Sequence, residues 1–317
     1  MMYAYLIHLS ANMWRKKGQK SANIKDEEDA IYHEEMCCDR ETWRKITDFL
    51  PECGINTLLI DVGDGIQFDR HPEISIPGAW SKEELKAELA RLRAMGITPL
   101  PKCNFSAGHN GWLKEYAYMI GTDLHLEICK DVIEEVIEVF DTPAFFHLGL
   151  EEEDAKNQAN QPVSMIRAPY KKLEDANYLF DVCRAKGVRP WIWACKADVE
   201  AFGGEEAFRA GIGKDVLLSG WHYTAINNCP DPTKGCPMAE YYVKFGEWGY
   251  EQVPTSSTWS WHLNSKQTMF FCKNNVAEGS IVGYMTAPWH LTVPKKLYAH
   301  MNDAFTFGNA KKDIYGE

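Results

Sequence analysis

Short apolar runs alternate along this chain with longer segments in which apolar residues recur at helical spacing. Runs that are apolar at consecutive positions predict strands buried on both faces, as in a parallel sheet. We expect eight such strands, at residues 3–9, 57–61, 97–103, 144–149, 189–195, 216–220, 250–254 and 280–285.

The segments between these runs predict helices, and two of them carry clear start signals. Asp39 can cap a helix at 40–50, and Ser81 with Glu84 forms a capping box for a helix at 82–95. The same kind of apolar stripe predicts helices at 123–140, 171–186 and 295–310, and a weaker stripe marks 198–210, 238–248 and 265–276.

Strands that alternate with helices over 317 residues predict a (β/α)8 barrel. The competing fold is an open doubly wound sheet, but no glycine-rich phosphate loop follows the first strand. No low-complexity linker interrupts the chain, so we expect a single α/β domain over residues 1–317.

The fourth expected strand ends abruptly in four consecutive carboxylates, Glu151, Glu152, Glu153 and Asp154. Adjacent like charges cannot be buried together unless they are neutralised or meet cations. The run therefore belongs at a strand end that faces a cleft or solvent, and in a barrel the C-terminal strand ends form the active site. The alternative is a solvated acidic loop.

Aromatic, amide and carboxylate residues follow the other expected strands. Sugar-binding sites use this set, because the C–H faces of a sugar stack on aromatic rings while carboxylates and amides hydrogen-bond its hydroxyls. Any single tryptophan could equally be a core residue. The residues that we expect to bind substrate are Asp64, Asn104, His109, Trp193, Trp221, Tyr223, Trp259 and Trp289.

Charge and cysteine content exclude several functions. A net charge of −11 argues against nucleic acid or an anionic membrane as partner, and no apolar stretch is long enough to span a bilayer. The first residues lack the features of a signal peptide.

The ten cysteines include no CxxC pair, so we expect reduced thiols in the cytoplasm and no metal or other cofactor. Only Cys229 and Cys236 flank a loop that a disulfide could close. The oligomeric state stays open.

Several segments follow one another in an order known from one enzyme family. They are residues 56–61, 78–84, 96–101 and 107–109, with looser matches at Trp193, 219–221 and Trp289. These segments resemble motifs of the family 20 glycoside hydrolases, the β-N-acetylhexosaminidases, and residues 147–152 resemble that family's His-x-Gly-Gly-Asp-Glu motif. The resemblance implies a (β/α)8 catalytic domain with Glu152 as acid and base. Glu151 then stands where the family Asp orients the 2-acetamido group of the substrate, which acts as the nucleophile.

The chain departs from the family pattern at several positions. Glu151 is one methylene longer than the family Asp, Lys102 replaces a Glu, and Asn104 replaces an Asp. The first strand lacks the Arg that grips sugar hydroxyls, and no Tyr-Asp pair ends the seventh. These differences indicate a divergent branch, with carbohydrate chemistry better supported than N-acetylhexosamine specificity.

The resulting hypothesis is a glycoside hydrolase that cleaves a terminal sugar, with a retaining, substrate-assisted route as the family implies. Glu152 must then hold a proton near neutral pH, and burial beside Glu151 raises its pKa. We expect His109 to be a partner of a carboxylate and His147 to lie beneath the site. Two alternatives remain, a catalytically silent sugar-binding barrel and a barrel enzyme that gathers a divalent cation on His109, Glu151, Glu152, Asp61 or Asp198, although no HxH or HExxH spacing is present.

Overall fold

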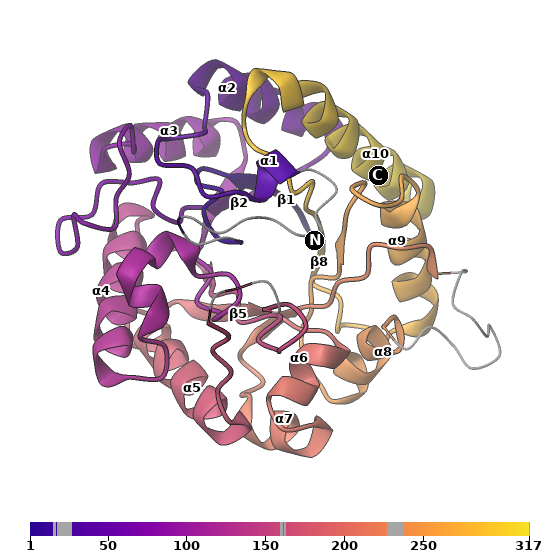
Figure 1. Ribbon diagram of the computed structural model, residues 1–317. Helices are drawn as coiled ribbons and strands as arrows, with labels where there is room; N and C mark the ends of the chain where they lie inside the picture. Colours follow the sequence, from indigo (N-terminus) through magenta and orange to yellow (C-terminus); the bar gives the residue numbers. More distant parts are fainter. Residues whose placement is uncertain (15–16, 18–26, 159–160, 162, 227–237, 317) are drawn as a thin grey trace.

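Eight parallel strands form one sheet that curls into a barrel, with helices around its outside (Figure 1). The computed structural model describes residues 1–14, 17, 27–158, 161, 163–226 and 238–316. Neighbouring strands follow the order β6-β5-β4-β3-β2-β1-β8-β7, which confirms the predicted (β/α)8 fold. The strands are β1 (Met2–His8), β2 (Thr57–Asp61), β3 (Thr98–Lys102), β4 (Phe145–His147), β5 (Arg189–Trp193), β6 (Leu217–Ser219), β7 (Thr255–Ser256) and β8 (Gly283–Thr286).

The barrel closes between β6 and β7 through single bridges instead of a regular ladder. Leu218 pairs with Gln252, and Trp221 pairs with Thr255. The prediction of the seventh strand at 250–254 was wrong, because the strand lies at Thr255–Ser256. Pro254 has no N–H to donate, so it cannot continue a ladder on both sides.

Helices follow most strands and begin where the capping signals predicted. Thr42 N donates to Asp39 Oδ1 at 2.7 Å, and Glu84 N donates to Ser81 Oγ at 3.1 Å. The helix expected at 198–210 is instead two short helices, because Gly203 and Gly204 adopt φ values of 101° and 95° between them. The helices are α1 (Glu27–Ala30), α2 (Arg40–Phe49), α3 (Lys82–Ala94), α4 (Asp123–Val139), α5 (Pro169–Ala185), α6 (Lys196–Ala201), α7 (Glu205–Gly211), α8 (Glu240–Glu247), α9 (Asn264–Asn275) and α10 (Leu297–Tyr315), with 3₁₀ turns η1 (Leu50–Cys53), η2 (Gly111–Tyr118) and η4 (Pro294–Lys296).

The apolar side chains divide into two buried layers. Strand residues alternate between the two faces of the sheet, so that Leu6 and Leu59 fill the barrel interior while Ile7 and Ile60 pack against the helices. Trp191 and Trp193 of β5 complete the inner layer. The barrel is thus a filled core, and any ligand must sit above it.

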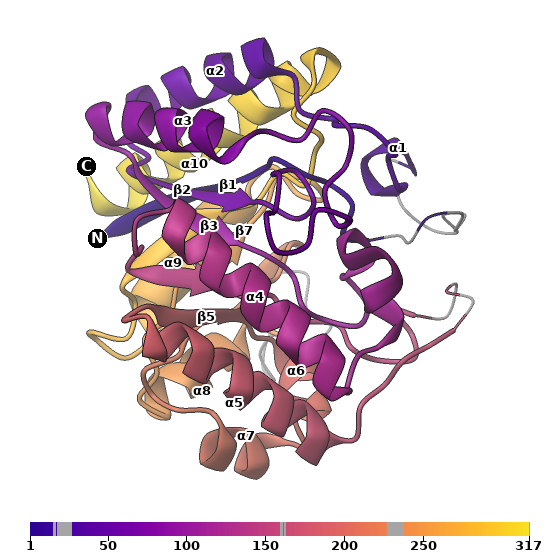
Figure 2. The same ribbon diagram turned by 90° about the vertical axis from the view of Figure 1, so that its left-hand side faces the viewer.

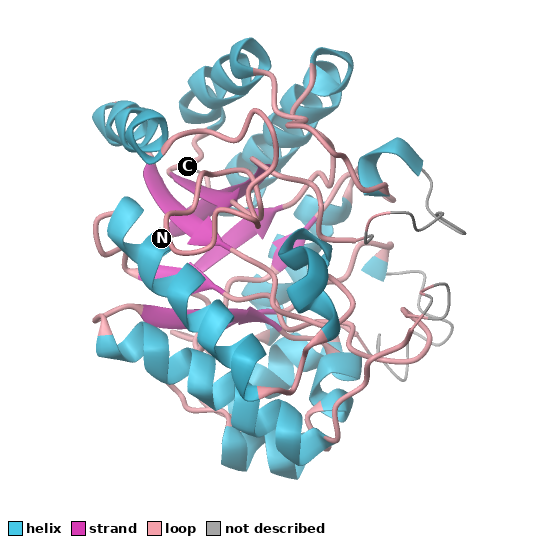
Figure 3. Ribbon diagram, turned by 60° about the vertical axis from the view of Figure 1, so that its left-hand side comes forward, coloured by secondary structure: helices cyan, strands magenta, loops and turns pink. Residues whose placement is uncertain are grey.

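The long loops gather at the end of the barrel to which the strands point, as Figures 2 and 3 show from the side. None of the helices in the described ranges is long and apolar enough to cross a membrane. The described cysteines are free thiols, and the predicted clip between Cys229 and Cys236 lies outside the described residues.

Candidate active site

Beyond β4 the chain turns sharply and carries the acidic run into the mouth of the barrel. Gly149, Leu150 and Glu152 adopt left-handed φ values of 73°, 74° and 54°. A Cβ on Gly149 would overlap the amide of Asn104, so the backbone approaches that side chain closely. For Leu150 and Glu152 the conformation costs about 1–3 kcal/mol each, and such strain is concentrated at functional sites.

The carboxylates of this run have different environments, and the run is not a solvated loop. Glu151 and Glu153 are buried, while the Glu152 side chain keeps 28% of its surface exposed. Glu153 meets a cation: Arg167 Nε donates to Glu153 Oε1 at 2.7 Å, and Arg167 Nη2 pairs with Glu153 Oε2. The opposing charge lowers the pKa of Glu153 although burial raises it. Arg167 thereby anchors the run beneath the mouth.

His109 lies between the two candidate catalytic carboxylates. Its Nδ1 is 3.4 Å from Glu151 Oε1, and its Nε2 is 3.4 Å from Glu152 Oε2. Asn104 Nδ2 also donates to Glu151 Oε1, at 2.6 Å. Glu151 Oε2 is buried and accepts no hydrogen bond from the described part of the protein. One oxygen of Glu151 is therefore fixed by its neighbours, and the other is buried without a hydrogen-bond donor among the described residues.

The pKa values of both carboxyls are raised. Burial raises the pKa of Glu152 to about 8, and the negative charges of Glu151 and Asp198 add to the shift. Burial also raises the pKa of Glu151, but the Lys102 charge and the Asn104 hydrogen bond oppose it. The surroundings thus favour the protonated form of both carboxyls, and the pKa of Glu152 lies near that expected of a general acid at neutral pH.

Asp198 holds the backbone of Glu152, a role that the sequence did not reveal. Its Oδ1 accepts from Glu152 N at 2.9 Å, and its Oδ2 accepts from Cys195 N at 2.8 Å. The position of an Asp three residues after Cys195, in the first turn of α6, is the capping signal that could have found it. Nearby, Lys172 is buried and its charge lowers the pKa of Asp198, although burial leaves that pKa raised to about 6.

A charged triad forms the floor beside the carboxylates. Lys102 Nζ donates to Asp61 Oδ2 at 2.7 Å, and His8 Nδ1 lies 3.2 Å from the same oxygen. Burial favours the neutral form of Asp61, but Lys102 and His8 outweigh it and lower its pKa. The residue that replaces the family Glu is therefore the buried counter-ion of Asp61.

His147 lies beneath the site as expected. Gly149 N donates to His147 Nδ1 at 3.1 Å, so the ring proton is on Nε2. Burial and the Lys102 charge lower the pKa of His147 well below its usual range, so the ring is neutral. Its ring packs on Trp193 at a centroid distance of 4.5 Å.

Four of the predicted aromatic residues form one wall. Trp289 adopts φ 58°, and its ring lies 5.8 Å from Trp193 and 6.3 Å from Tyr223. Trp221 stacks on Tyr223 at 5.3 Å. Burial raises the pKa of Tyr223 well above its usual range, and the Glu151 and Glu152 charges add to the shift.

Two predicted residues stand apart from this group. Trp259 lies at the surface with 37% of its area exposed. Asp64 is buried: Ser10 Oγ donates to its Oδ1, and Asn12 Nδ2 donates to its Oδ2 at 2.9 Å. Asp64 thus ties down the β1 loop where the family has its Arg. Substrate contact by Asp64 or Trp259 stays a prediction.

The metal-dependent alternative gains no support from the geometry. Throughout the described ranges, no group of three or more His, Cys, Asp or Glu side chains is arranged to hold a metal ion.

Solved structures share this barrel over almost the whole chain. A β-N-acetylhexosaminidase from Bacteroides fragilis matches with a TM-score of 0.60 and 14% identity, covering 95% of this chain and 65% of that one. A GH20 catalytic module of the pneumococcal exo-β-D-N-acetylglucosaminidase StrH matches with a TM-score of 0.63 and 15% identity, covering 99% and 83%. The GH20 exo-β-N-acetylglucosaminidase from Vibrio harveyi matches with 0.62 and 12%, covering 99% and 56%. The fold is the barrel of the family 20 glycoside hydrolases.

The likeness to family 20 is one of fold. No protein-family model and no curated protein sequence matches the chain. Within the family motif, Leu150 stands at the second glycine and still adopts the left-handed φ of 74° that a glycine there would reach without strain. Leu150 therefore stands in a conformation that is strained for a residue with a Cβ.

Proposed function

We propose that this protein is a glycoside hydrolase that removes a terminal sugar, with Glu152 as general acid and base and Glu151 as the orienting carboxylate. The observation that carries this proposal is the contact of both carboxylates with His109 at the barrel mouth, where Glu152 is the more exposed of the two. The family 20 fold supports the same reaction class.

In the proposed mechanism each group has its own step. Protonated Glu152 gives its proton to the glycosidic oxygen as the bond from that oxygen to C1 breaks. The resulting carboxylate then takes a proton from the water that attacks C1. Glu151 Oε2 lacks a hydrogen-bond donor among the described residues, and in this proposal the substrate supplies one.

An N-acetylhexosamine is the sugar that suits this arrangement best. Its amide N–H can donate to Glu151 Oε2, and its carbonyl oxygen can attack C1 with retention of configuration, as in substrate-assisted enzymes. Asn104 and His109 hold the other oxygen of Glu151, so the longer side chain is constrained at its tip. This restraint compensates for the extra methylene relative to the family Asp.

A hydrolysis screen tests the proposal. Nitrophenyl β-glycosides that differ at C2, C4 and C6 are incubated with the wild type and with Glu151→Gln as the matched control. We expect nitrophenol to be released from a 2-acetamido glycoside, and at least about tenfold less to be released from its 2-hydroxyl counterpart. The Glu151→Gln variant should lose about 10²–10³ in rate, the size of a lost transition-state contact.

The silent sugar-binding barrel predicts the opposite outcome. Under this hypothesis no nitrophenol is released from any glycoside, while calorimetry detects sugar binding to the wild type. Equal turnover of 2-acetamido and 2-hydroxyl glycosides would support the hydrolase function and contradict the substrate-assisted route.

A further inference from the structure

The peptide bond between the two candidate catalytic carboxylates is held at both of its polar ends. The carbonyl oxygen of Glu151 accepts a hydrogen bond from Ser106 Oγ, and Glu152 N donates to Asp198 Oδ1 at 2.9 Å. Ser106 and Asp198 are both buried, so water does not compete for these bonds. We call this pair of hydrogen bonds the peptide clamp. It fixes the orientation of the Glu151–Glu152 peptide plane relative to the barrel.

The two sides of the peptide clamp come from the strands on either side of β4. The acidic run follows β4, and the sheet places β3 on one side of β4 and β5 on the other. Ser106 lies in the loop after β3, and Asp198 lies in α6, after β5. Each neighbouring strand therefore supplies one side chain that holds the acidic run from its own side.

The orientation of this peptide plane decides the conformation of Glu152. The φ angle describes rotation about the N–Cα bond of Glu152, and its value of 54° is strained for a residue with a Cβ. A peptide plane that is free to rotate would relieve this strain, and the Glu152 side chain would then change direction. Strained conformations persist only where the surrounding structure determines them from several sides. The peptide clamp is such a constraint.

Ser106 is itself well fixed, because its loop folds around it. Ser106 N donates to Asn104 Oδ1 at 3.0 Å, and His109 N donates to Ser106 O at 3.0 Å. Gly108 N donates to Ser106 Oγ at 3.3 Å. A Cβ on Gly108 would lie 3.1 Å from Glu152 O, so the loop packs directly against the acidic run. Ser106 is thus a point of contact between the His109 loop and both carboxylate residues.

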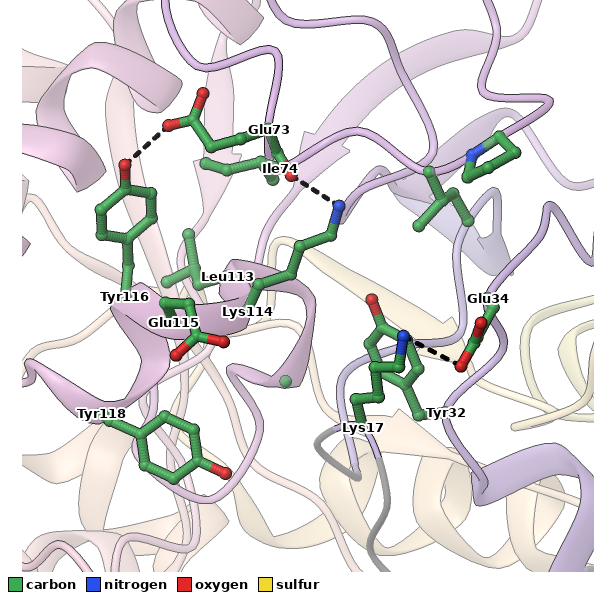
Figure 4. Close-up of a pocket in the computed structure, with 13 residues that line it drawn as sticks. Lys17, Tyr32, Glu34, Glu73, Ile74, Leu113, Lys114, Glu115, Tyr116 and Tyr118 are labelled. Carbon is green, nitrogen blue, oxygen red and sulfur yellow. Dashed lines mark hydrogen bonds and ion pairs between the residues drawn. The ribbon is translucent and has the colours of Figure 1, made fainter.

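The same loop continues into η2, which is anchored at its far end. Lys114 Nζ donates to Glu73 O at 2.6 Å, and Tyr116 OH donates to Glu73 Oε1 at 2.7 Å, at the wall of a cavity of about 590 Å³ (Figure 4). These bonds tie η2 to the loop after β2. Ser106 therefore belongs to a segment that is supported from both ends, as a rigid support for the peptide clamp must be.

We propose that Ser106 is a positioning residue of the hydrolase, which together with Asp198 holds the Glu151–Glu152 peptide so that the Glu152 carboxyl faces the glycosidic oxygen. The proposal rests on the hydrolase function proposed above. It adds to that function a residue that acts through the backbone and does not need to contact the substrate.

Glu152 depends more on the peptide clamp than Glu151 does. The tip of the Glu151 side chain is held separately, because Asn104 Nδ2 donates to its Oε1 at 2.6 Å and His109 Nδ1 lies 3.4 Å from the same oxygen. The Glu152 side chain keeps 28% of its surface exposed. Loss of the peptide clamp should therefore impair proton donation by Glu152 more than substrate orientation by Glu151.

Ser106→Ala removes one side of the peptide clamp, and Ser280→Ala is its matched control. Ser280 Oγ also donates to a backbone carbonyl, Tyr250 O at 2.9 Å, and also accepts one hydrogen bond, from Gln252 Nε2 at 2.8 Å. It is buried like Ser106, but it precedes β8 and so lies at the opposite end of the barrel from the acidic run. The two substitutions thus remove equivalent bonds at different places.

The variants are compared on an unactivated glycoside and on a nitrophenyl glycoside of the same sugar. Ser106→Ala should lower kcat on the unactivated substrate about 10–10²-fold, the effect of a displaced catalytic group. It should change kcat on the nitrophenyl substrate by less than about threefold and KM by less than about twofold. Equal losses on both substrates, or losses no larger than those of Ser280→Ala, would overturn the proposal.

A double-mutant cycle tests whether Ser106 and Asp198 act on the same peptide. Because release of one end already frees the plane, adding Ser106→Ala to Asp198→Ala should lower kcat by less than about threefold further. Ser280→Ala combined with Asp198→Ala should instead give the product of the two single losses. If Ser106→Ala and Asp198→Ala also multiply, the two residues do not form one clamp.

Hydrogen exchange at the Glu152 amide tests the peptide clamp without any turnover. Ser106→Ala should speed this exchange at least about tenfold, and Ser280→Ala should leave it unchanged. If the wild type cleaves no glycoside, the hydrolase proposal fails, and this measurement alone decides whether Ser106 orients the peptide. Faster exchange in Ser106→Ala alone supports that role, and the same exchange rate in both variants rejects it.

Discussion

The side chain of Glu152 is partly exposed, yet its surroundings raise its pKa. Burial and the charges of Glu151, Asp198 and Asp154 favour its protonated form, while Asp198 also grips its backbone. The environment of the Glu152 carboxyl group therefore differs from that of the surface carboxylates elsewhere on the chain. The raised pKa of Glu152 therefore depends on groups outside its own side chain.

The pH dependence of the reaction follows from this environment. Only protonated Glu152 can donate, and its pKa is raised to about 8, so kcat/KM should be sustained at neutral pH and fall as pH rises through about 8. A pH–rate profile on a substrate with a poor leaving group measures this limb. A fall centred near pH 4.5, the ordinary value for a glutamate, would mean that Glu152 is not the acid.

Two Asp variants separate charge from positioning. Asp198→Asn and Asp154→Asn each remove a negative charge near Glu152, so both should move the basic limb to lower pH, by about 0.5–1 unit. Only Asp198 bonds Glu152 N, so only Asp198→Asn should also lower kcat on the plateau. Equal kcat values in the two variants would remove the positioning role.

At the scale of elements, the turn after β4 is the feature that places the carboxylates. Gly149 has φ 73° and lies against Asn104, which in turn bonds Glu151. Gly187 has nearly the same φ, 75°, but an added Cβ there would meet nothing within 4 Å. The two glycines therefore share the backbone strain and differ only in the contact with Asn104.

This pair gives a matched comparison of stability and activity. Gly187→Ala should cost about 1–2 kcal/mol in the free energy of unfolding, from positive φ alone. Gly149→Ala should cost about 1–3 kcal/mol more because the Cβ displaces Asn104, and it should lower kcat by disturbing Glu151. Denaturant titration and kinetics measure both. Similar losses in the two variants would show that the Asn104 contact is unimportant.

How far the sequence predicted the elements depends on how local their signals are. Strand β2 and the starts of α2 and α3 were predicted correctly, because consecutive apolar residues and side-chain caps act within a few positions. Strand β7 was misplaced, because its pairing depends on β8 and on the bridges to β6. Helix η2 has no repeating apolar stripe and was missed.

In the candidate site, too, local signals could be read from the sequence, whereas contacts between distant residues could not. The proximity of Glu151, Glu152 and His109 could be predicted because they follow strand ends, and barrel topology brings strand ends together; their roles stay predictions. Arg167, Lys172 and Asp198 were not assigned their roles, because each acts on a residue far away in the sequence. No local pattern marks the partner of Glu153 as Arg167, which lies 14 positions along the chain.

On the scale of the whole molecule, the seam between β6 and β7 is paired less regularly than the sheet around β2. Strand β2 forms continuous ladders with both β1 and β3, whereas β6 and β7 are joined by single bridges. Local opening should therefore occur at this seam, since few backbone hydrogen bonds must break together.

Hydrogen exchange measured by mass spectrometry tests this expectation. Amides at 217–220 and 250–256 should exchange before those at 57–61. Added sugar should slow exchange near the seam, because Trp221 lies next to it in the aromatic wall. Uniform protection around the barrel would contradict the account of an incompletely paired closure.

The central claim is that Glu152 donates the proton and Glu151 orients the substrate. The most direct test compares Glu152→Gln and Glu151→Gln on a nitrophenyl glycoside, which needs little protonation, and on an unactivated glycoside of the same sugar. Glu152→Gln should lose about 10²–10⁴ in rate on the unactivated substrate and much less on the nitrophenyl one. Glu151→Gln should lose a similar factor on both. Small, equal losses in all four measurements would contradict the claim and remove the hydrolase assignment.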